Sequence, residues 1–74
     1  LSVTGYKVRG VKNTNLEWRG VSSADIYRDG DLVDLGVKGS TYTDTIGKGG
    51  GSHIYKVCES GTTTNNCAEK TVFF

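Results

Sequence analysis

The residue types of a nucleophilic triad are all present in this chain of 74 residues. His53 is the only histidine, Asp25 and Asp44 could orient its ring, and several serines could supply the hydroxyl. Such a triad requires mutual hydrogen bonds inside a concave site that excludes water. No spacing in the sequence brings these groups together, and a packed domain of this length has little room for such a cavity. We therefore expect no enzyme activity from the chain itself and place His53 at the start of a strand.

Glycines surround Lys48 in residues 47–52, where freed backbone amides beside a lysine could bind a phosphate. The GxxxxGK order of a phosphate-binding loop and the helix that follows it are both missing. We predict instead a mobile connection that leads into the strand containing Tyr55.

Carboxylates at Asp29, Asp31 and Asp34 have the spacing of part of a calcium-binding loop. The glycine at the sixth position and the terminal glutamate of that loop do not follow. Asp29-Gly30 is, in contrast, typical of a tight hairpin turn, because this dipeptide tolerates the positive φ angles that such turns need. We expect a hairpin here, and neither a metal nor a cofactor.

Cys58 and Cys67 flank a polar, turn-forming stretch that should return the chain antiparallel and place the two sulfurs opposite each other. We predict a disulfide across this hairpin, worth about 2.5 to 3 kcal/mol on the chain-entropy model. A zinc site would find only these sulfurs and the distant His53, one ligand too few, and the C-x-x-C of a redox pair is missing. A disulfide indicates an oxidising compartment, so we expect a secreted, extracellular protein.

Length and charge limit the remaining functions. The chain has a net charge of +1, and its nine basic and eight acidic residues are interspersed, which disfavours nucleic-acid binding. Its longest apolar runs have two or three residues, whereas a membrane span needs about 20. We expect residues 1–74 to form one monomeric domain taken from a longer secreted protein, because the chain starts at Leu1 without a leader.

Short alternating stretches predict an all-β chain. Eleven glycines, no proline and many threonines accompany the alternation, and no segment has a sustained helical period. We predict a small antiparallel β-sandwich of six or seven strands, with a bulge at Gly5 where the first edge strand changes phase. The inward positions of these strands predict a core of Leu16, Trp18, Ile26, Tyr42, Tyr55, Val57 and Val72.

Alternation also places Tyr27, Ile54 and Phe73 on the outward faces of their strands. Aromatic and apolar side chains exposed together could form a shallow platform for a peptide or a sugar chain, so these three are the candidate ligand residues. The alternative is that they are isolated exposed residues, or that they pack against a neighbouring domain.

The order of several residue blocks resembles a fibronectin type III-like domain. The blocks are LEW at 16–18, ADIYRDG at 24–30, YTD at 42–44 and YKVCE at 55–59. With GYKVRGV at 5–11 and the cysteine hairpin, the chain looks like the modules at the C-terminus of secreted subtilisin-like serine proteases of marine and related Gram-negative bacteria. The resemblance implies a fibronectin type III/immunoglobulin-like sandwich in which Trp18 fills the core and Tyr55 forms a corner with the preceding loop.

The resemblance also implies a function. Such a module is non-catalytic and binds the protein substrate of its parent protease, or acts as a spacer and stabiliser. Two alternatives stay open: a cell-surface adhesion or carbohydrate-binding module that uses Tyr27 and Phe73, and a regulator that docks on the parent catalytic domain. The chain departs from the family pattern by lacking proline and by placing Lys70 where the last strand usually has an apolar residue. It also lacks an Arg-Gly-Asp tripeptide, so no integrin adhesion is inferred.

Overall fold

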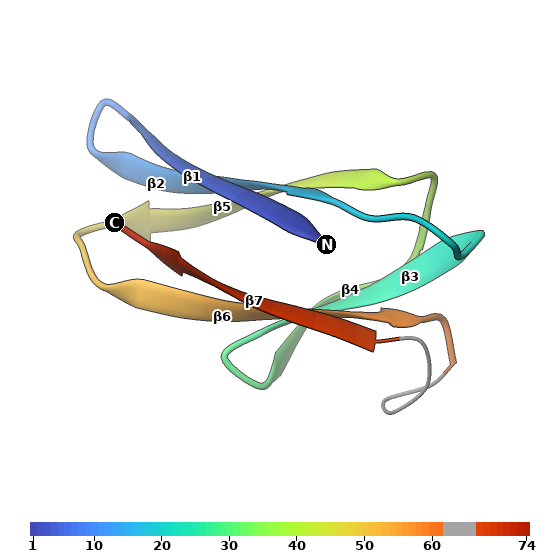
Figure 1. Cartoon of the computed structure of the whole chain (residues 1–74). Coiled ribbons are helices and arrows are strands. Elements are labelled where there is room, and N and C mark those ends of the chain that lie inside the picture. Colours follow the sequence, from blue (N-terminus) through green and yellow to red (C-terminus); the bar gives the residue numbers. More distant parts are fainter. Residues whose placement is uncertain (62–66) are drawn as a thin grey trace.

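The computed structural model describes residues 1–61 and 67–74, which form strands, turns and connections but no helix. This confirms the prediction of an all-β fold with six or seven strands (Figure 1). The strands are β1 (Ser2–Val8), β2 (Val11–Glu17), β3 (Ser23–Arg28), β4 (Asp31–Lys38), β5 (Thr41–Lys48), β6 (Ser52–Glu59) and β7 (Cys67–Phe73).

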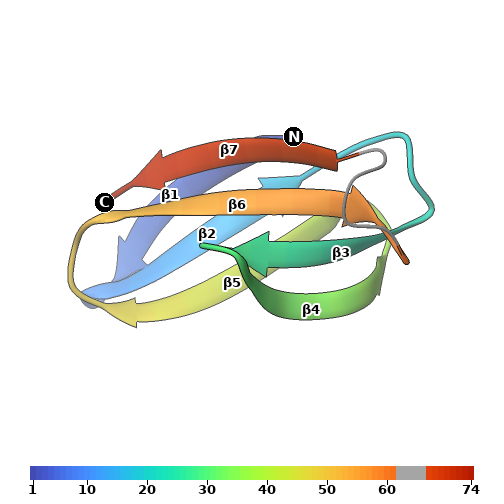
Figure 2. The same ribbon diagram turned by 90° about the horizontal axis from the view of Figure 1, so that it is seen from below.

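The strands form two antiparallel sheets that lie face to face (Figure 1, Figure 2). One sheet has three strands in the order β1-β2-β5, and the other has four in the order β4-β3-β6-β7. The chain therefore crosses between the sheets after β2, β4 and β5. This arrangement is a small β-sandwich, as predicted.

Two tight turns set the register of the hairpins. Asp29 and Gly30 have φ angles of 53° and 87°, and Arg28 and Asp31 on either side of them are register partners. Two successive positive φ angles are typical of the two-residue turns that match the twist of antiparallel strands. The Asp29-Gly30 hairpin is thus confirmed. Arg9 and Gly10 form a similar turn between β1 and β2, with φ angles of 52° and 80°.

The hydrophobic core lies between the two sheets and is built from their inward positions. Leu16, Ile26 and Tyr55 are completely buried, whereas Tyr42 is only half-buried against the edge of the cluster. The whole buried cluster consists of Leu16, Trp18, Ala24, Ile26, Tyr55, Val57 and Val72.

The predicted bulge at Gly5 is wrong. β1 pairs residue for residue with β2 from Ser2 opposite Glu17 to Val8 opposite Val11. Gly5 keeps its place on the inner face, where a Cβ atom would lie 2.6 Å from the Val72 side chain. The glycine therefore permits close approach of β7 rather than a break in pairing. The register shift of this sheet lies instead in the β2–β5 pairing, next to Lys12.

The connection between β5 and β6 is shorter than the predicted loop over residues 47–52. Residues 47 and 48 pair as the end of β5, and Ser52 begins β6, so residues 49–51 alone form the connection. Gly49 and Gly51 have φ angles of 113° and 100°, a region that favours glycine.

Candidate functional site

The predicted disulfide is present and joins β6 to β7. Cys58 and Cys67 are register partners with Cα atoms 4.0 Å apart, and Cys58 is completely buried. Residues 62–66 of the turn-forming stretch lie outside the described residues. The bridge is located on the outer face of the four-stranded sheet, since Tyr55 and Val57 occupy the inward positions of β6. It fastens β7, an edge strand, to the rest of the sheet.

Asp25 is buried beside this disulfide, as the register partner of Cys58. Its carboxylate accepts hydrogen bonds from the backbone amides of Gly36 at 2.9 Å and Gly61 at 3.0 Å, and from the Ser60 hydroxyl at 3.2 Å. The Gly36 amide, followed by the Gly61 amide, lowers the pKa of Asp25 because both bonds stabilise the charged form. Asp25 thus connects the residues that follow β6 to Gly36 on β4.

Asp44 belongs to a second network, which joins the two sheets. Its Oδ2 atom accepts hydrogen bonds from Arg28 Nη1 at 2.5 Å and from the Tyr55 hydroxyl at 2.6 Å. Asp44 lies on β5, whereas Arg28 and Tyr55 belong to the other sheet. Burial, and then the hydrogen bond to Asp44, raise the pKa of Tyr55 to about 12. The Tyr55 hydroxyl therefore bonds to β5, whereas the resemblance implied a corner with the loop that precedes its strand.

His53 belongs to a third network. Its Nδ1 atom is 2.7 Å from Asp29 Oδ2, and its Nε2 atom is 3.1 Å from Lys12 Nζ. The hypothetical triad partners Asp25 and Asp44 are each engaged elsewhere. The structure does not bring the imagined triad together.

Sequence reasoning missed Lys12, which is the most unusual member of this network. Lys12 is only 6% exposed, and its ammonium group donates to the carbonyl oxygen of Gly50 at 3.0 Å. Its Nζ atom also lies 5.7 Å from the centre of the Phe74 ring. The signal was available, because Lys12 is in phase with the inward-facing Leu16. Alternation extended back from Leu16 through Thr14 reaches Lys12 on the same face.

The inward polar residues gather at one end of the sandwich, where the β5–β6 connection and the C-terminus lie (left in Figure 1). Register places them there: Lys12 pairs with Gly47, and Arg28 with Tyr55. We call Lys12, Arg28, Asp44 and His53 the polar end.

The candidate ligand residues lie on the outer face of the four-stranded sheet. Tyr27 on β3 is opposite Leu32 on β4, while Ile54 on β6 and Phe73 on β7 are diagonal neighbours. Ile54 is 49% exposed, Leu32 50% and Phe73 77%. Diagonal neighbours in a sheet are close enough for large side chains to touch. Leu32, Tyr27, Ile54 and Phe73 therefore form an apolar stripe that runs obliquely across all four strands.

A shallow groove of about 320 Å³ lies at Tyr27 and Ile54, the two middle residues of this apolar stripe. It is lined by Tyr27, Gly30, Ile54, Lys56 and Glu69. Lys56 and Glu69 are register partners, so the groove combines apolar walls with one charge of each sign. Such a groove could receive an apolar side chain of a polypeptide and hydrogen-bond its backbone.

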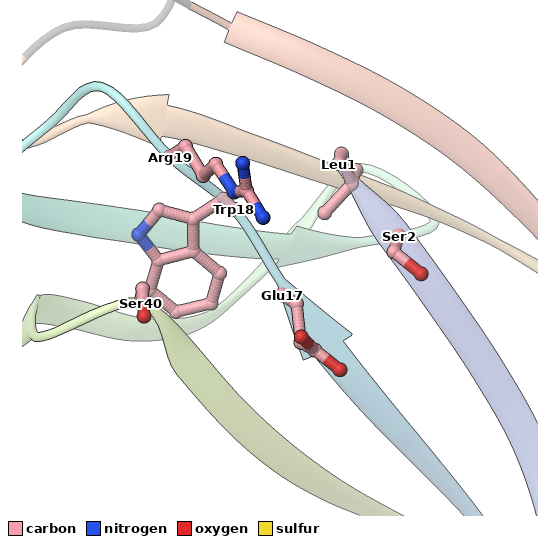
Figure 3. A pocket seen from close by; sticks show the side chains of 6 residues that line it. All are labelled: Leu1, Ser2, Glu17, Trp18, Arg19 and Ser40. Carbon is pink, nitrogen blue, oxygen red and sulfur yellow. The ribbon is translucent and has the colours of Figure 1, made fainter.

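A larger pocket, of about 470 Å³, opens beside the start of β1 and the end of β2, away from the polar end (Figure 3). Glu17, Trp18 and Arg19, which follow one another in the chain, form one side of it, and its lining is completed by Leu1, Ser2 and Ser40. The indole of Trp18 is buried there, and its Nε1 atom has no hydrogen-bond partner. The lining is mostly polar, and it contains none of the candidate ligand residues.

The carboxylates with calcium-like spacing do not converge. Asp29 binds His53, and Asp34 accepts a hydrogen bond from the backbone amide of Leu35 at 2.8 Å. Within residues 1–61 and 67–74, no three His, Cys, Asp or Glu side chains are grouped so that they could hold a metal ion. The same residues contain no helix that is long and apolar enough to cross a membrane.

Comparisons of the chain with protein families, curated proteins and solved structures find no match. The resemblance to fibronectin type III-like protease modules is one of residue pattern alone.

Proposed function

We propose that this chain is a non-catalytic accessory module of a secreted bacterial serine protease and that it binds the protein substrate through the apolar stripe. The observation that carries the proposal is the exposure of Ile54 and Phe73 on the disulfide-bonded sheet, where a groove opens at Ile54. The parent protease is inferred from the residue pattern. The binding role is inferred from the surface.

Several properties of the stripe favour a polypeptide as the ligand. Exposed apolar patches on small domains commonly mark interaction sites. The register-paired strands beneath the stripe hold its side chains in place without a loop that would have to become ordered. Lys56 and Glu69, at the edge of the groove, offer a donor and an acceptor to a peptide backbone. An extended segment could thus insert one apolar side chain beside Tyr27.

A second candidate is carbohydrate binding, which the 77% exposure of the Phe73 ring favours. A sugar ring stacks on such an aromatic face through its C–H groups. Tyr27 would supply the second aromatic group and, from its hydroxyl, a hydrogen bond. The alternatives of spacer and of intramolecular regulator use no specific feature of this surface.

The experiment is a pull-down of the oxidised domain on insoluble collagen, casein and chitin. We expect retention on the protein matrices and a loss of about fivefold in Ile54→Ser and in Phe73→Ser, since one contact at the centre of an interface is worth about 1 kcal/mol or more. Val8→Ser is the matched control, because Val8 is similarly exposed, at 53%, but lies on the three-stranded sheet.

Each outcome decides between the functions. Retention on chitin alone, lost in Phe73→Ser, would favour the carbohydrate-binding module. Retention that Val8→Ser weakens as much as Ile54→Ser would mean nonspecific adhesion. No retention on any matrix would contradict substrate binding and leave the spacer or docking role.

A further inference from the structure

The hydrogen bonds of His53 fix where its protons must be. Lys12 carries an ammonium group, which can only donate, so His53 Nε2 must accept at the 3.1 Å contact. The other ring nitrogen, Nδ1, then carries the proton and donates to Asp29 Oδ2 at 2.7 Å. An amine ordinarily binds a proton about four orders of magnitude more tightly than an imidazole, so the shared proton belongs to Lys12. We call Lys12, His53 and Asp29 the histidine network.

Lys12 also ties together segments that are distant in the sequence. From β2 it reaches the Gly50 carbonyl in the β5–β6 connection and the Phe74 ring beyond β7. The His53 ring and the same Phe74 ring are arranged edge to face, with centroids 6.1 Å apart. One buried cation thus joins three segments, and one of its two hydrogen bonds depends on His53 being neutral.

We propose that the histidine network is a pH-sensitive switch. In it, protonation of His53 displaces the Lys12 ammonium and so breaks its hydrogen bond to the carbonyl of Gly50. An imidazolium has no acceptor at Nε2 and would face a second cation at 3.1 Å. The proposal concerns the fold itself and is independent of the proposed function.

The surrounding charges decide which partner leaves. The hydrogen bond to His53, followed by that from the Ile54 amide, lowers the pKa of Asp29, which therefore stays ionised while the imidazole protonates. Arg28 precedes Asp29, and its charge acts in the same direction. Lys7 on β1 is the register partner of Lys12 and adds further positive charge to its surroundings. The imidazolium therefore stays with Asp29, and Lys12 moves toward solvent.

Nuclear magnetic resonance of the whole domain tests this directly. At about pH 7.5 we expect the neutral Nδ1–H tautomer of His53, which ring nitrogen shifts identify. On acidification, the carbonyl shift of Gly50 should change with the same midpoint as the His53 ring. The amide of Ile54, which donates to Asp29 Oδ1 at 2.9 Å, should stay protected.

Lys12→Met keeps the packing of the side-chain stem and removes the ammonium. We expect the imidazole of this variant to bind its proton more tightly, because a like charge has been removed. The Gly50 carbonyl should then no longer respond to pH. Lys7→Met is the matched control, since it removes an exposed lysine from the facing position of β1 and should shift the midpoint much less.

Three results would contradict this pH-sensitive switch. One is an Nε2–H tautomer in the wild-type protein near neutral pH. Another is a Gly50 carbonyl that does not follow the His53 titration. The third is an equal midpoint in Lys12→Met and wild type. The first two need no variant, so the test stands even if Lys12→Met does not fold.

Discussion

The two ends of the sandwich interior are built by the same strands from different kinds of side chain. At the end opposite the polar end, Leu16, Trp18, Ala24, Ile26 and Val57 fill the space between the sheets, and we call this group the apolar end. At the polar end, strand β2 contributes Lys12 where it contributes Leu16 further along, and β3 contributes Arg28 in phase with Ile26. The alternation of inward and outward positions along a strand thus places apolar and charged side chains on the same inner face.

The two ends are stabilised in different ways. Burial of apolar surface is non-directional, so the apolar end depends on volume and shape. Buried charges cost free energy unless each is paired, so the polar end depends on the geometry of Asp44 and His53. We expect the apolar end to set the stability of the domain and the polar end to set its sensitivity to pH.

The largest effect should come from Leu16→Ala at the apolar end. Leu16 is completely buried, and truncation of such a leucine costs about 3 kcal/mol or more through lost burial and the resulting cavity. Unfolding in urea measures the loss. Leu32→Ala, which removes the same atoms from a half-exposed site, should change stability far less. Equal losses in both variants would mean that the apolar end is not the main source of stability.

Removal of the disulfide should have the next largest effect. The Cys58→Ser/Cys67→Ser double variant should lose about 2.5 kcal/mol, because the bridge closes a short loop in the unfolded chain. Oxidised and reduced wild-type protein, compared by thermal unfolding, give an independent value. If the domain kept its full stability without the disulfide, the packing of the two sheets alone would account for that stability.

Asp44→Asn should break the pairing at the polar end. The substitution leaves the Arg28 guanidinium without its carboxylate, and the expected cost is about 2 kcal/mol, less than for a fully buried pair, since Arg28 is 31% exposed. Tyr55→Phe removes the second bond to Asp44 and should cost about 1 kcal/mol. An Asn variant as stable as wild type would show that pairing at this end contributes nothing to stability.

Alkaline pH should also weaken the fold, through the buried Tyr55 hydroxyl. The pKa of Tyr55 is raised to about 12 in the folded protein, against an ordinary value of 10.0. The unfolded chain therefore releases this proton first, and stability falls as pH rises from about 10 toward about 12. The fall, measured by urea unfolding at increasing pH, should be steeper in wild type than in Tyr55→Phe. An equal fall in stability with pH in the wild type and in Tyr55→Phe would contradict the raised pKa of Tyr55.

The sequence predicts the parts of this molecule that local rules control. Alternation predicts the strands, Asp29-Gly30 predicts a turn through its tolerance of positive φ, and the spacing of Cys58 and Cys67 predicts the bridge. These features depend on neighbours in the chain or on one hairpin.

Features that depend on contacts between strands could not be predicted in this way. Gly5 resembles a bulge in sequence, yet it serves the close approach of Val72 from a strand more than sixty residues away. The partnership of Lys12, Asp29 and His53 joins three segments, and no local pattern encodes it. The oblique apolar stripe likewise needs the register of four strands before its members become neighbours.

The most direct test of the proposed function is the depletion of the oxidised domain from solution by increasing amounts of insoluble casein. We predict saturable binding by the wild type, and a dissociation constant at least about tenfold weaker in the Ile54→Ser/Phe73→Ser double variant, whose fold is checked by circular dichroism. Val8→Ser should bind like the wild type. Identical isotherms for the wild type and the double variant, or no depletion by the wild type, would contradict binding of protein substrate through the apolar stripe.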